Sequence, residues 1–435
     1  YPWGCFEQTV SAAWPLLTQP ELVKHSDPAL ADKKAVAARI AKIEAMQNQD
    51  GGFPRWAGES SQPWESLYGA QLLLEARRLG YRVSPDTLKA SLEYARALLP
   101  VMPDTESDED WRDTLTRRAY ASFVLALAKE APLGWMESLR DKLPQLSPSG
   151  RLLLASAYAL AGEKQEAGAI LGKEAPALKK RPGGNDNYES ELRNAALTLL
   201  ARSCMDPAGA EAASAAATLI SKLQKAPHYS TQEGGFAFAA LGRWAAAAPR
   251  EGAPAGSLTA MPSGKTVGTV SEKKRTVTAT APGGYKAQNS GKARLYAAWS
   301  ASFIPAGPVP ARAEGIALTQ KLTERNGKPL GSETTRGTAI TATVVLTPKA
   351  GALRNVVAVL PLPAGFEIEN PRLTGAGENA PAGVREEMRD DRLVIFINEL
   401  KKPLTVKYSL RAVTEGLFTV PQHYAECMYD PGISA

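Results

Sequence analysis

The amino-acid sequence predicts a multidomain α + β protein in which a helical part is followed by β structure. Up to about residue 250 the chain is rich in Ala, Leu, Glu, Arg and Lys, which are good helix formers. Beyond that point β-branched residues alternate with polar ones in short runs, as in strands. A length of 435 residues also exceeds what one ordinary hydrophobic core organises. We therefore expect two or three domains.

In the first part, apolar residues recur at helical spacing, for example across residues 64–76. Similar helical segments begin near Trp111, Gly150, Tyr188 and Tyr229, a spacing of roughly 40 residues that is typical of helical hairpins. Hairpins at this spacing can stack as a solenoid or close into a ring. The loops between them do not decide which.

The second part begins with a Pro-, Gly-, Ala- and Ser-rich stretch from Glu251 to Lys265, which predicts a linker. Another Pro-rich break lies at 305–310. Short strands with turn signals between them predict a β-sandwich in the final section. The predicted strands are 265–270, 275–280, 294–299, 338–346, 356–360, 393–397 and 404–410.

Composition excludes several classes of function. The net charge of +6 is a small excess of 51 basic over 45 acidic residues, spread along the chain, so we expect no nucleic-acid partner. No apolar stretch approaches the roughly 18 residues of a membrane span. The start at Tyr1 is neither an initiator Met nor a signal peptide, and we expect a fragment of a longer chain.

The three cysteines, Cys5, Cys204 and Cys427, are too few and too widely spaced for a disulfide framework. With only three His they show no zinc-ligand spacing, so we expect neither a metal nor a cofactor. Cys204 lies in an apolar helical run and is interpreted as a buried small hydrophobe. Cys427 is either packed in the same way or a functional thiol.

The sharpest local motif is Gly4-Cys5-Phe6-Glu7-Gln8. A Cys three residues before a Gln can bring its sulfur to the Gln carbonyl across one helical turn, and attack there expels ammonia and leaves an internal thioester. Gly4 lets the backbone bend around the ring. A helix that starts here would favour the thiolate through its dipole. By itself, however, Cys-x-x-Gln is more often an ordinary free Cys near a Gln.

The wider sequence resolves this choice, because residues 1–9, Tyr-Pro-Trp-Gly-Cys-Phe-Glu-Gln-Thr, resemble the thioester segment of the bacterial α2-macroglobulins. That family usually has Leu or Gly at the position of Phe6. Further similar segments run along the chain: 46–56, 230–233, 360–367, 408–412 and 425–431. The resemblance therefore covers the whole sequence.

The resemblance implies three domains. Residues 1–250 would form a thioester domain, an α/α toroid of helical hairpins; 251–308 would be the C-terminal half of a CUB-like β domain; and 309–435 would be a macroglobulin-like β-sandwich. In this family a protease cuts an upstream bait region, and the thioester then acylates Lys amines of the attacker. The implied function is a broad-spectrum endopeptidase inhibitor and not an enzyme.

The implied partners are target proteases and the upstream macroglobulin-like domains of the parent chain. The implied location is the periplasm, with the parent an inner-membrane lipoprotein. A thioester needs an apolar cover against water, and the positions that match the family's cover are Tyr1, Met428 and Tyr429, beside the thioester pair Cys5 and Gln8.

Some complement relatives use a His to redirect the thioester towards hydroxyls. His25, His228 and His423 do not match that position, so we expect a preference for amines.

Three other interpretations remain. Carbohydrate- and isoprenoid-active enzymes also use α/α toroids, and residues 47–53 are like the repeats of triterpene cyclases, but such enzymes need an acid array in an aromatic-lined pocket. A binding scaffold that has lost its thioester is the second alternative, although Cys5 and Gln8 are both present. A Cys-dependent peptidase is the third, but it would need a positioned His base.

Overall fold

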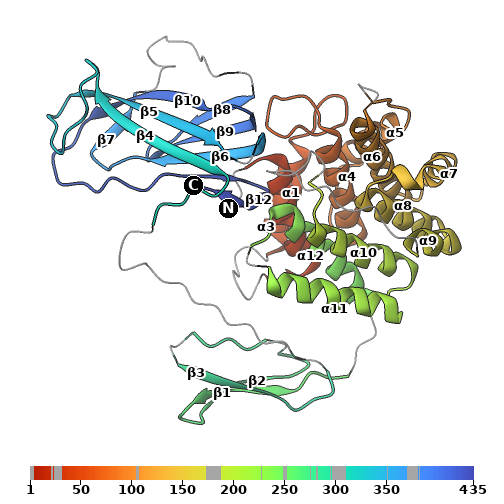
Figure 1. The fold of residues 1–435 in the computed structure, drawn as a ribbon. Coiled ribbons are helices and arrows are strands. Elements are labelled where there is room, and N and C mark those ends of the chain that lie inside the picture. Colours follow the sequence, from red (N-terminus) through yellow and green to blue (C-terminus); the bar gives the residue numbers. More distant parts are fainter. Residues whose placement is uncertain are drawn as a thin grey trace.

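The computed structural model describes the whole chain except residues 1–3, 21–22, 24–31, 104–106, 173–187, 227, 248–251, 275, 281–282, 294, 296–309, 350, 370–380 and 382. Helices come first and antiparallel sheets second, so the predicted fold class is confirmed (Figure 1). The helices are α1 (Phe6–Thr18), α3 (Lys33–Glu44), α4 (Pro63–Arg78), α5 (Pro85–Ala97), α6 (Asp108–Leu127), α7 (Leu133–Asp141), η1 (Leu143–Gln145), α8 (Pro148–Ala161), α9 (Lys164–Leu171), α10 (Glu191–Met205), α11 (Ala210–Lys225) and α12 (Thr231–Ala247).

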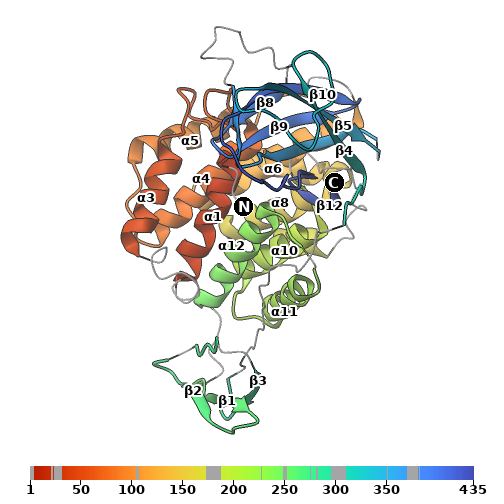
Figure 2. The same cartoon turned by 90° about the vertical axis from the view of Figure 1, so that its left-hand side faces the viewer.

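The helices close into a ring. Going round it, α1 contacts α4, α4 contacts α6, and the chain of contacts continues through α8 and α10 to α12, which packs back against α1. Helices α3, α5, α7, α9 and α11 lie outside this inner ring (Figures 1 and 2). The α12–α1 pairing is what makes the structure a toroid and not an open solenoid.

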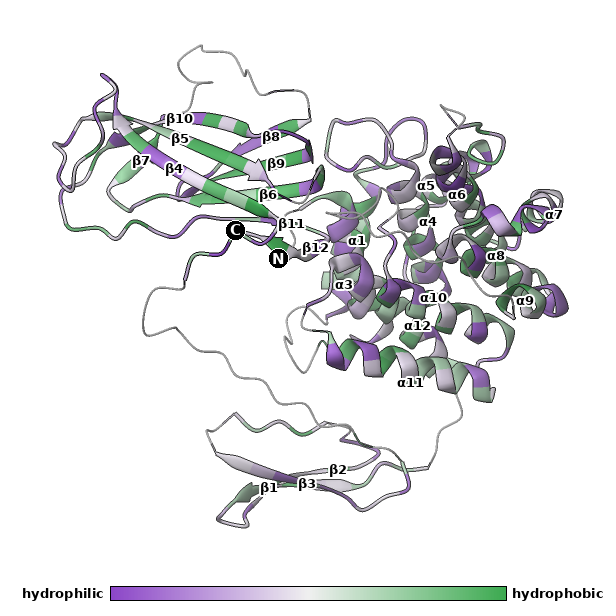
Figure 3. Ribbon diagram, in the orientation of Figure 1, coloured by the Kyte–Doolittle hydropathy of each residue, from purple (hydrophilic) through white to green (hydrophobic). Residues whose placement is uncertain are grey.

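Burial separates the inner helices from the outer ones. On inner helix α4 every side chain from Trp64 to Ala76 is buried. On outer helix α11 only Ala212, Ala216 and Leu219 are buried, one narrow stripe at the spacing i, i+4, i+7. Figure 3 shows the resulting mixture of hydrophilic and hydrophobic residues along α11.

The strands fall into three sheets. Their bounds are β1 (Gly256–Met261), β2 (Thr266–Val270), β3 (Gly284–Asn289), β4 (Ile316–Glu324), β5 (Ala339–Pro348), β6 (Leu353–Pro361), β7 (Phe366–Ile368), β8 (Val384–Met388), β9 (Arg392–Leu400), β10 (Leu404–Ala412), β11 (Tyr424–Cys427) and β12 (Asp430–Ser434). The first sheet has the order β2-β1-β3 and stands apart from the other two bodies in both views (Figures 1 and 2).

The first sheet corrects two predictions. The predicted linker 251–265 contains β1, whose residues pair with both β2 and β3. Small residues hid this strand, which its neighbours define. The predicted strand 275–280 does not form: residues 276–280 have no regular structure, and Val277 lies against Gly268 of β2 without extending its ladder. The predicted strand 294–299 falls almost entirely outside the described residues.

The other two sheets form the predicted sandwich, with orders β4-β5-β10-β7 and β12-β11-β6-β9-β8. Strand β5 alternates buried and half-buried residues, as expected for a strand with one face on the core. Strand β6 differs, because it is buried without a break from Val356 to Leu360. Val356, Ala358 and Leu360 fill the sandwich core, whereas Val357 and Val359 lie in a second cluster with Cys5 of the helical ring.

This second cluster is the contact between ring and sandwich. Its buried members are Cys5, Trp56, Val357, Val359, Val394 and Phe396. The rings of Trp56 and Phe396 have centroids 4.6 Å apart, and the Arg385 guanidinium lies 4.3 Å from the Trp56 centroid. The helical ring therefore packs on the outer face of β6 and β9. None of the described helices has the length and apolarity needed to cross a membrane.

Candidate functional site

Cys5 and Gln8 lie at the first turn of α1, buried to 1% and 3% exposure. Cys5 is the N-cap residue, with extended backbone, and its Sγ accepts a hydrogen bond from the backbone N–H of Gln8 at 3.4 Å. Gln8 occupies the third helical position. Its backbone N–H is one of the free donors of the first turn, and the N-cap side chain satisfies it. The thiol of Cys5 and the backbone of Gln8 therefore meet within one helical turn.

Two glycines allow this geometry. Gly4 has a φ of +94°, a left-handed conformation that lets the chain turn sharply into Cys5. The ring of Phe6 stacks on Phe53 with centroids 4.5 Å apart, and it lies so close to Gly69 of α4 that a Cβ there would be 2.7 Å from it. Phe6 at this position is thus accommodated by Gly69.

The last domain covers the sulfur. The hydroxyl of Tyr429 lies 3.8 Å from Cys5 Sγ, and Met428 packs on the cluster that contains Cys5. The turn between β11 and β12 thus brings Tyr429 to the thiol and Met428 to the cluster around it. The third predicted cover residue, Tyr1, lies outside the described residues.

Glu7 is a fully buried carboxyl group between the two motif residues. It accepts hydrogen bonds from Ser11 Oγ at 2.5 Å, from Thr231 Oγ1 at 2.8 Å and from the Tyr429 hydroxyl at 2.8 Å. Ser11 also contacts the hydroxyl of Tyr68 at 2.9 Å. Glu7 therefore ties α1 to α12 and to the sandwich.

Burial raises the pKa of Cys5 to about 12, and the nearby charge of Glu7 adds to this effect. The helix dipole was expected to favour the thiolate, but burial outweighs it and Cys5 is a neutral thiol. Burial also raises the pKa of Glu7, against the hydrogen bonds that it accepts. The hydroxyl pKa of Tyr429 lies well above its usual value for the same reason.

Sequence reasoning missed a second layer of the cover. Tyr188 meets Tyr429 edge to face with centroids 4.5 Å apart, and its hydroxyl donates to Glu65 at 2.7 Å. Arg55 Nε donates to the same Glu65 oxygen at 2.8 Å, and the Arg55 guanidinium lies over the Tyr188 ring. Arg55 fell within a segment that resembles the family, but no local pattern distinguished Tyr188 or Glu65.

Arg55 also reaches the sandwich, where its Nη1 donates to Asn355 Oδ1 at 3.1 Å. Asn355 lies in β6 with a φ of +52°, and its carbonyl accepts the backbone N–H of Met428 at 2.9 Å. One strained residue thus holds both the helical ring and the turn that carries the cover.

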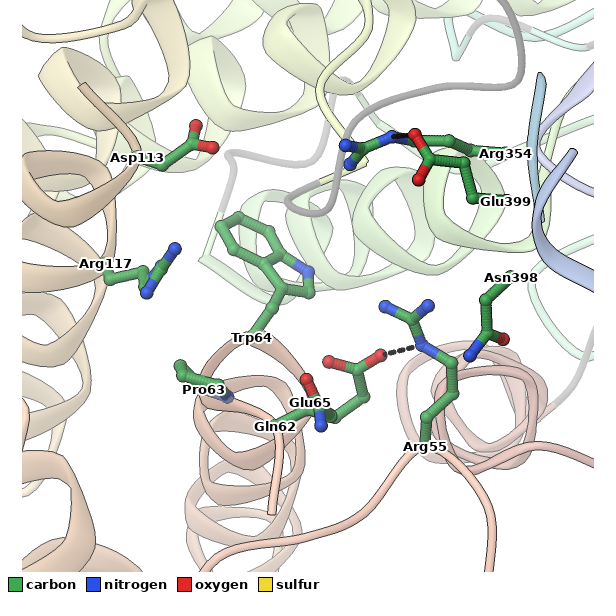
Figure 4. A pocket seen from close by; sticks show the side chains of 10 residues that line it. All are labelled: Arg55, Gln62, Pro63, Trp64, Glu65, Asp113, Arg117, Arg354, Asn398 and Glu399. Carbon is green, nitrogen blue, oxygen red and sulfur yellow. Dashed lines mark hydrogen bonds and ion pairs between the residues drawn. The ribbon is translucent and has the colours of Figure 1, made fainter. Parts of the chain in front are cut away.

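A cavity of about 370 Å³ opens beside this layer, between α4, α6 and the sandwich (Figure 4). Its acids and bases are largely paired: Arg55 with Glu65, and Arg354 with Glu399 at 3.9 Å. The lining residues are Arg55, Gln62, Pro63, Trp64, Glu65, Asp113, Arg117, Arg354, Asn398 and Glu399.

The middle of the helical ring is filled with packed aromatic side chains. Trp64 lies 4.7 Å from Tyr120, and Tyr68 stacks on Phe236 at 5.2 Å. The guanidinium of Arg193 lies 4.5 Å from the Trp64 centroid. All five side chains are buried. This arrangement does not provide the open acid-lined pocket that a toroidal carbohydrate- or isoprenoid-active enzyme needs.

The other two cysteines and His423 have other neighbours. Cys427 is fully buried in the sandwich core, and Cys204 packs beside the core of the ring. His423 Nε2 hydrogen-bonds Gln320 of β4, a strand of the four-stranded sheet, at 2.7 Å. His25 is outside the described residues. Within the described ranges, no three His, Cys, Asp or Glu residues gather as metal ligands would.

The structure is a helical toroid docked on a β-sandwich, with a buried Cys-x-x-Gln turn at the contact. Comparison with known proteins shows which class of protein shares this arrangement. Residues 315–432 match the family model of the bacterial α2-macroglobulin MG10 domain. The resemblance predicted from the sequence is confirmed: the chain is related over its whole length to the C-terminal part of bacterial α2-macroglobulins.

Among curated relatives, Escherichia coli α2-macroglobulin is 27% identical over 99% of this chain, and the Yersinia pestis α2-macroglobulin homolog is 24% identical over all of it. The chain spans 28% and 24% of their lengths. The fold is similar to native E. coli α2-macroglobulin from domain MG7 to the C-terminus, with a TM-score of 0.78, 22% identity and coverage of 100% of this chain and 72% of that one. It is also similar to Salmonella α2-macroglobulin reacted with methylamine, with a TM-score of 0.77, 21% identity and coverage of 100% and 29%.

Proposed function

We propose that this chain is the thioester-bearing part of a broad-spectrum endopeptidase inhibitor, in which a thioester between Cys5 and Gln8 acylates Lys amines of an attacking protease. The observation that carries the proposal is the first turn of α1, where the buried Cys5 sulfur accepts the backbone N–H of Gln8 and lies beside the Tyr429 hydroxyl of the sandwich. A thioester is an electrophile because a thiolate leaves far more readily than an amide nitrogen.

The amide form of Gln8 has a specific defect that ring closure relieves. Its Oε1 is buried and accepts no hydrogen bond from the described protein atoms. A buried acceptor without a donor costs about 1–3 kcal/mol. A thioester carbonyl is a weaker acceptor than an amide carbonyl, so the same site disfavours the open form relative to the ring.

Burial also supports the use of the ring as a latent electrophile. Cys5 and Gln8 are almost fully buried, and Tyr429 and Met428 close the outer side. Water must be kept out while the sandwich is docked. Separation of the sandwich from the ring would expose the carbonyl to an amine, so activation would require a domain movement.

Further parts of the proposal concern the parent protein. The exposed sheet β2-β1-β3 would be half of a CUB-like domain completed by upstream strands, and upstream macroglobulin-like domains would carry the bait. The parent would be a lipid-anchored protein on the periplasmic face of the inner membrane. Cells that express the parent can be fractionated, and the accessibility of the parent to added protease can be measured in spheroplasts. A parent found in the cytosol would contradict this location.

The first experiment is the intact mass of freshly purified protein with and without methylamine, followed by thiol titration. A ring lowers the mass by about 17 Da, the mass of the expelled ammonia, and methylamine then adds about 31 Da and releases one thiol. Cys5→Ser should abolish both changes. Cys204→Ser, a matched loss of a distant thiol, should retain them.

The outcomes are distinct. The unaltered sequence mass with Gln intact at position 8 would contradict the thioester. A gain of about 1 Da, with Glu at position 8, would mean that the ring formed and then hydrolysed, because hydrolysis replaces the amide by an acid. Peptide mapping separates the two states.

A further inference from the structure

We propose that Tyr429 and Glu7 form a proton relay that closes the Cys5–Gln8 ring, so that the thioester forms only once the sandwich has docked. This inference rests on the proposed function and adds a chemical role to a side chain that otherwise serves as a lid. The relay joins two domains, since Glu7 belongs to α1 and Tyr429 to the turn after β11.

The contacts have a consistent direction. The Tyr429 hydroxyl donates its proton to Glu7 Oε2 at 2.8 Å. Its oxygen is therefore left to accept from the Cys5 thiol, whose Sγ is 3.8 Å away. The S–H, the phenol O–H and the carboxylate form one chain of donor and acceptor groups.

Glu7 is positioned as the acceptor at the end of this chain. Ser11 and Thr231 hold both of its oxygens, so the carboxylate stays aimed at Tyr429. The carboxylate is fully buried, and a buried carboxylate is a stronger base than one in water. Space around the network is tight, because a Cβ on Gly235 would lie 2.1 Å from the Tyr68 hydroxyl and 3.0 Å from Ser11 Oγ.

The proton movements balance. As Cys5 Sγ bonds to Gln8 Cδ, the thiol proton passes to the Tyr429 oxygen while the phenol proton passes to Glu7. The carbonyl electrons move to Oε1 of Gln8. When the C–N bond breaks, the carbonyl re-forms, and Glu7 returns its proton through Tyr429 to the departing nitrogen. Ammonia leaves, and Glu7 is again a carboxylate.

The relay explains why the electrophile is not exposed while the chain folds. A neutral, buried thiol is a weak nucleophile, because the thiolate is the reactive form. The hydroxyl that activates it belongs to Tyr429 of the sandwich, 424 residues further along the chain. The ring therefore closes only under its own cover, since Tyr429 is both the catalytic residue and the lid.

The test compares Tyr429→Phe and Glu7→Gln with wild type in the full chain. The Phe ring keeps the packing on Tyr188 but lacks the hydroxyl, and the Gln amide keeps the shape of Glu7 but cannot take the proton. Tyr408→Phe is the matched control, because Tyr408 is a buried tyrosine of the same domain whose hydroxyl contacts Gln320. Newly made protein is sampled over time, and loss of ammonia is followed by mass.

We expect ring closure in Tyr429→Phe and Glu7→Gln to slow by about 100-fold, the scale of general acid–base catalysis, with position 8 remaining Gln. Glu7→Asp, which keeps a carboxylate, should recover part of the rate. A lid without chemistry gives another result: the ring closes normally in Tyr429→Phe and then hydrolyses, leaving Glu at position 8. That result, or wild-type closure in Glu7→Gln, overturns the relay.

Thermal unfolding shows whether each variant folds. If Glu7→Gln does not fold, the rate of ring closure in Tyr429→Phe decides whether the relay exists. If wild type itself keeps Gln at position 8 and its full mass, the proposed thioester fails together with the relay. If wild type forms the ring and both variants close it at the wild-type rate, the relay is wrong but the proposed thioester stands.

Discussion

Arg55 Nη1 lies 3.1 Å from Asn355 Oδ1, and this bond joins the helical ring to a strand residue in the left-handed conformation. Asn tolerates that conformation better than most residues, since its short polar side chain can hydrogen-bond locally. Its carbonyl also holds the backbone of Met428. The position of the lid therefore depends on one residue of β6.

Asn355→Leu should loosen the turn that carries Met428 and Tyr429. It places a bulky side chain at a positive φ and removes the partner of Arg55, which together cost about 3 kcal/mol. We expect a lower melting temperature and faster loss of the thioester, measured by thermal unfolding and by the mass gain on hydrolysis.

Asn355→Gly is the control, since it keeps the backbone conformation while it removes the bond to Arg55. It should lie between wild type and Asn355→Leu in both measurements. A Leu variant with wild-type melting and thioester lifetime would show that the left-handed conformation has no such role.

Phe396 and Ile395 separate the two faces of β9. Phe396 packs on Trp56 of the ring, whereas Ile395 lies in the sandwich core. Removing a buried Phe or Ile side chain costs about 2–5 kcal/mol, but at different places. Phe396→Ala should weaken docking and accelerate methylamine uptake, while Ile395→Ala should mainly lower the melting temperature of the sandwich.

The measurement is the rate of methylamine incorporation beside a thermal melt for each variant. Equal rates of uptake in the two variants would show that docking through this face does not protect the thioester.

Much of the fold follows from period and composition. The alternation in β5 and the single apolar stripe of α11 each indicate one buried face, and both elements have one. The uninterrupted apolar run from Val356 to Leu360 was predicted only as a strand, although it also indicates which faces of that strand are buried. In an antiparallel sandwich, such a run signals that the second face is covered too.

The cover was harder to predict. Met428 and Tyr429 were predicted from the resemblance. The contact of Tyr429 with Cys5 spans 424 residues of sequence, which no local pattern specifies. Tyr188 and Asn355 owe their roles to left-handed backbone conformations. Such conformations are imposed by tertiary packing on residues that would otherwise avoid them.

Gly69→Ala should disturb the start of α1. The added Cβ would lie 2.7 Å from the Phe6 ring and 3.1 Å from Phe53. Overpacking of this kind costs about 1–3 kcal/mol, and we expect a lower melting temperature with slower ring closure. Gly134→Ala is the control, because Gly134 lies in helix α7 with no atom within 4 Å of its Cβ position. The free energy of unfolding of this variant should rise by up to about 1 kcal/mol. Equal melting temperatures for the two variants would contradict the packing argument.

After hydrolysis of the ring, the Cys5 thiol should resist ionisation. Burial raises its pKa from 9.0 to about 12, so the thiol contributes stability below pH 9 that is lost as the pH rises through 12. At pH 9 about half of an unfolded chain's thiol is ionised, against about one part in a thousand in the fold, so alkylation should be about 500-fold slower.

Alkylation with isotope-coded reagent before and after unfolding, read by peptide mapping, reports Cys5 separately from the other two thiols. Rapid labelling of Cys5 in the folded protein at pH 9 would mean that the lid does not exclude solvent from the sulfur.

The thioester should prefer amines to hydroxyls. Redirection towards hydroxyls needs an imidazole at the ring, and His423 is held by Gln320 on the opposite sheet of the sandwich. Methylamine should therefore open the ring at concentrations where glycerol leaves it intact, with a mass gain of about 31 Da for the amine and none of about 92 Da for the alcohol. Ethylene glycol serves as a smaller alcohol, so that exclusion by size is separated from chemical preference. If both alcohols add as readily as methylamine, another group at the ring activates hydroxyls, and Glu7 acting through Tyr429 becomes the candidate base.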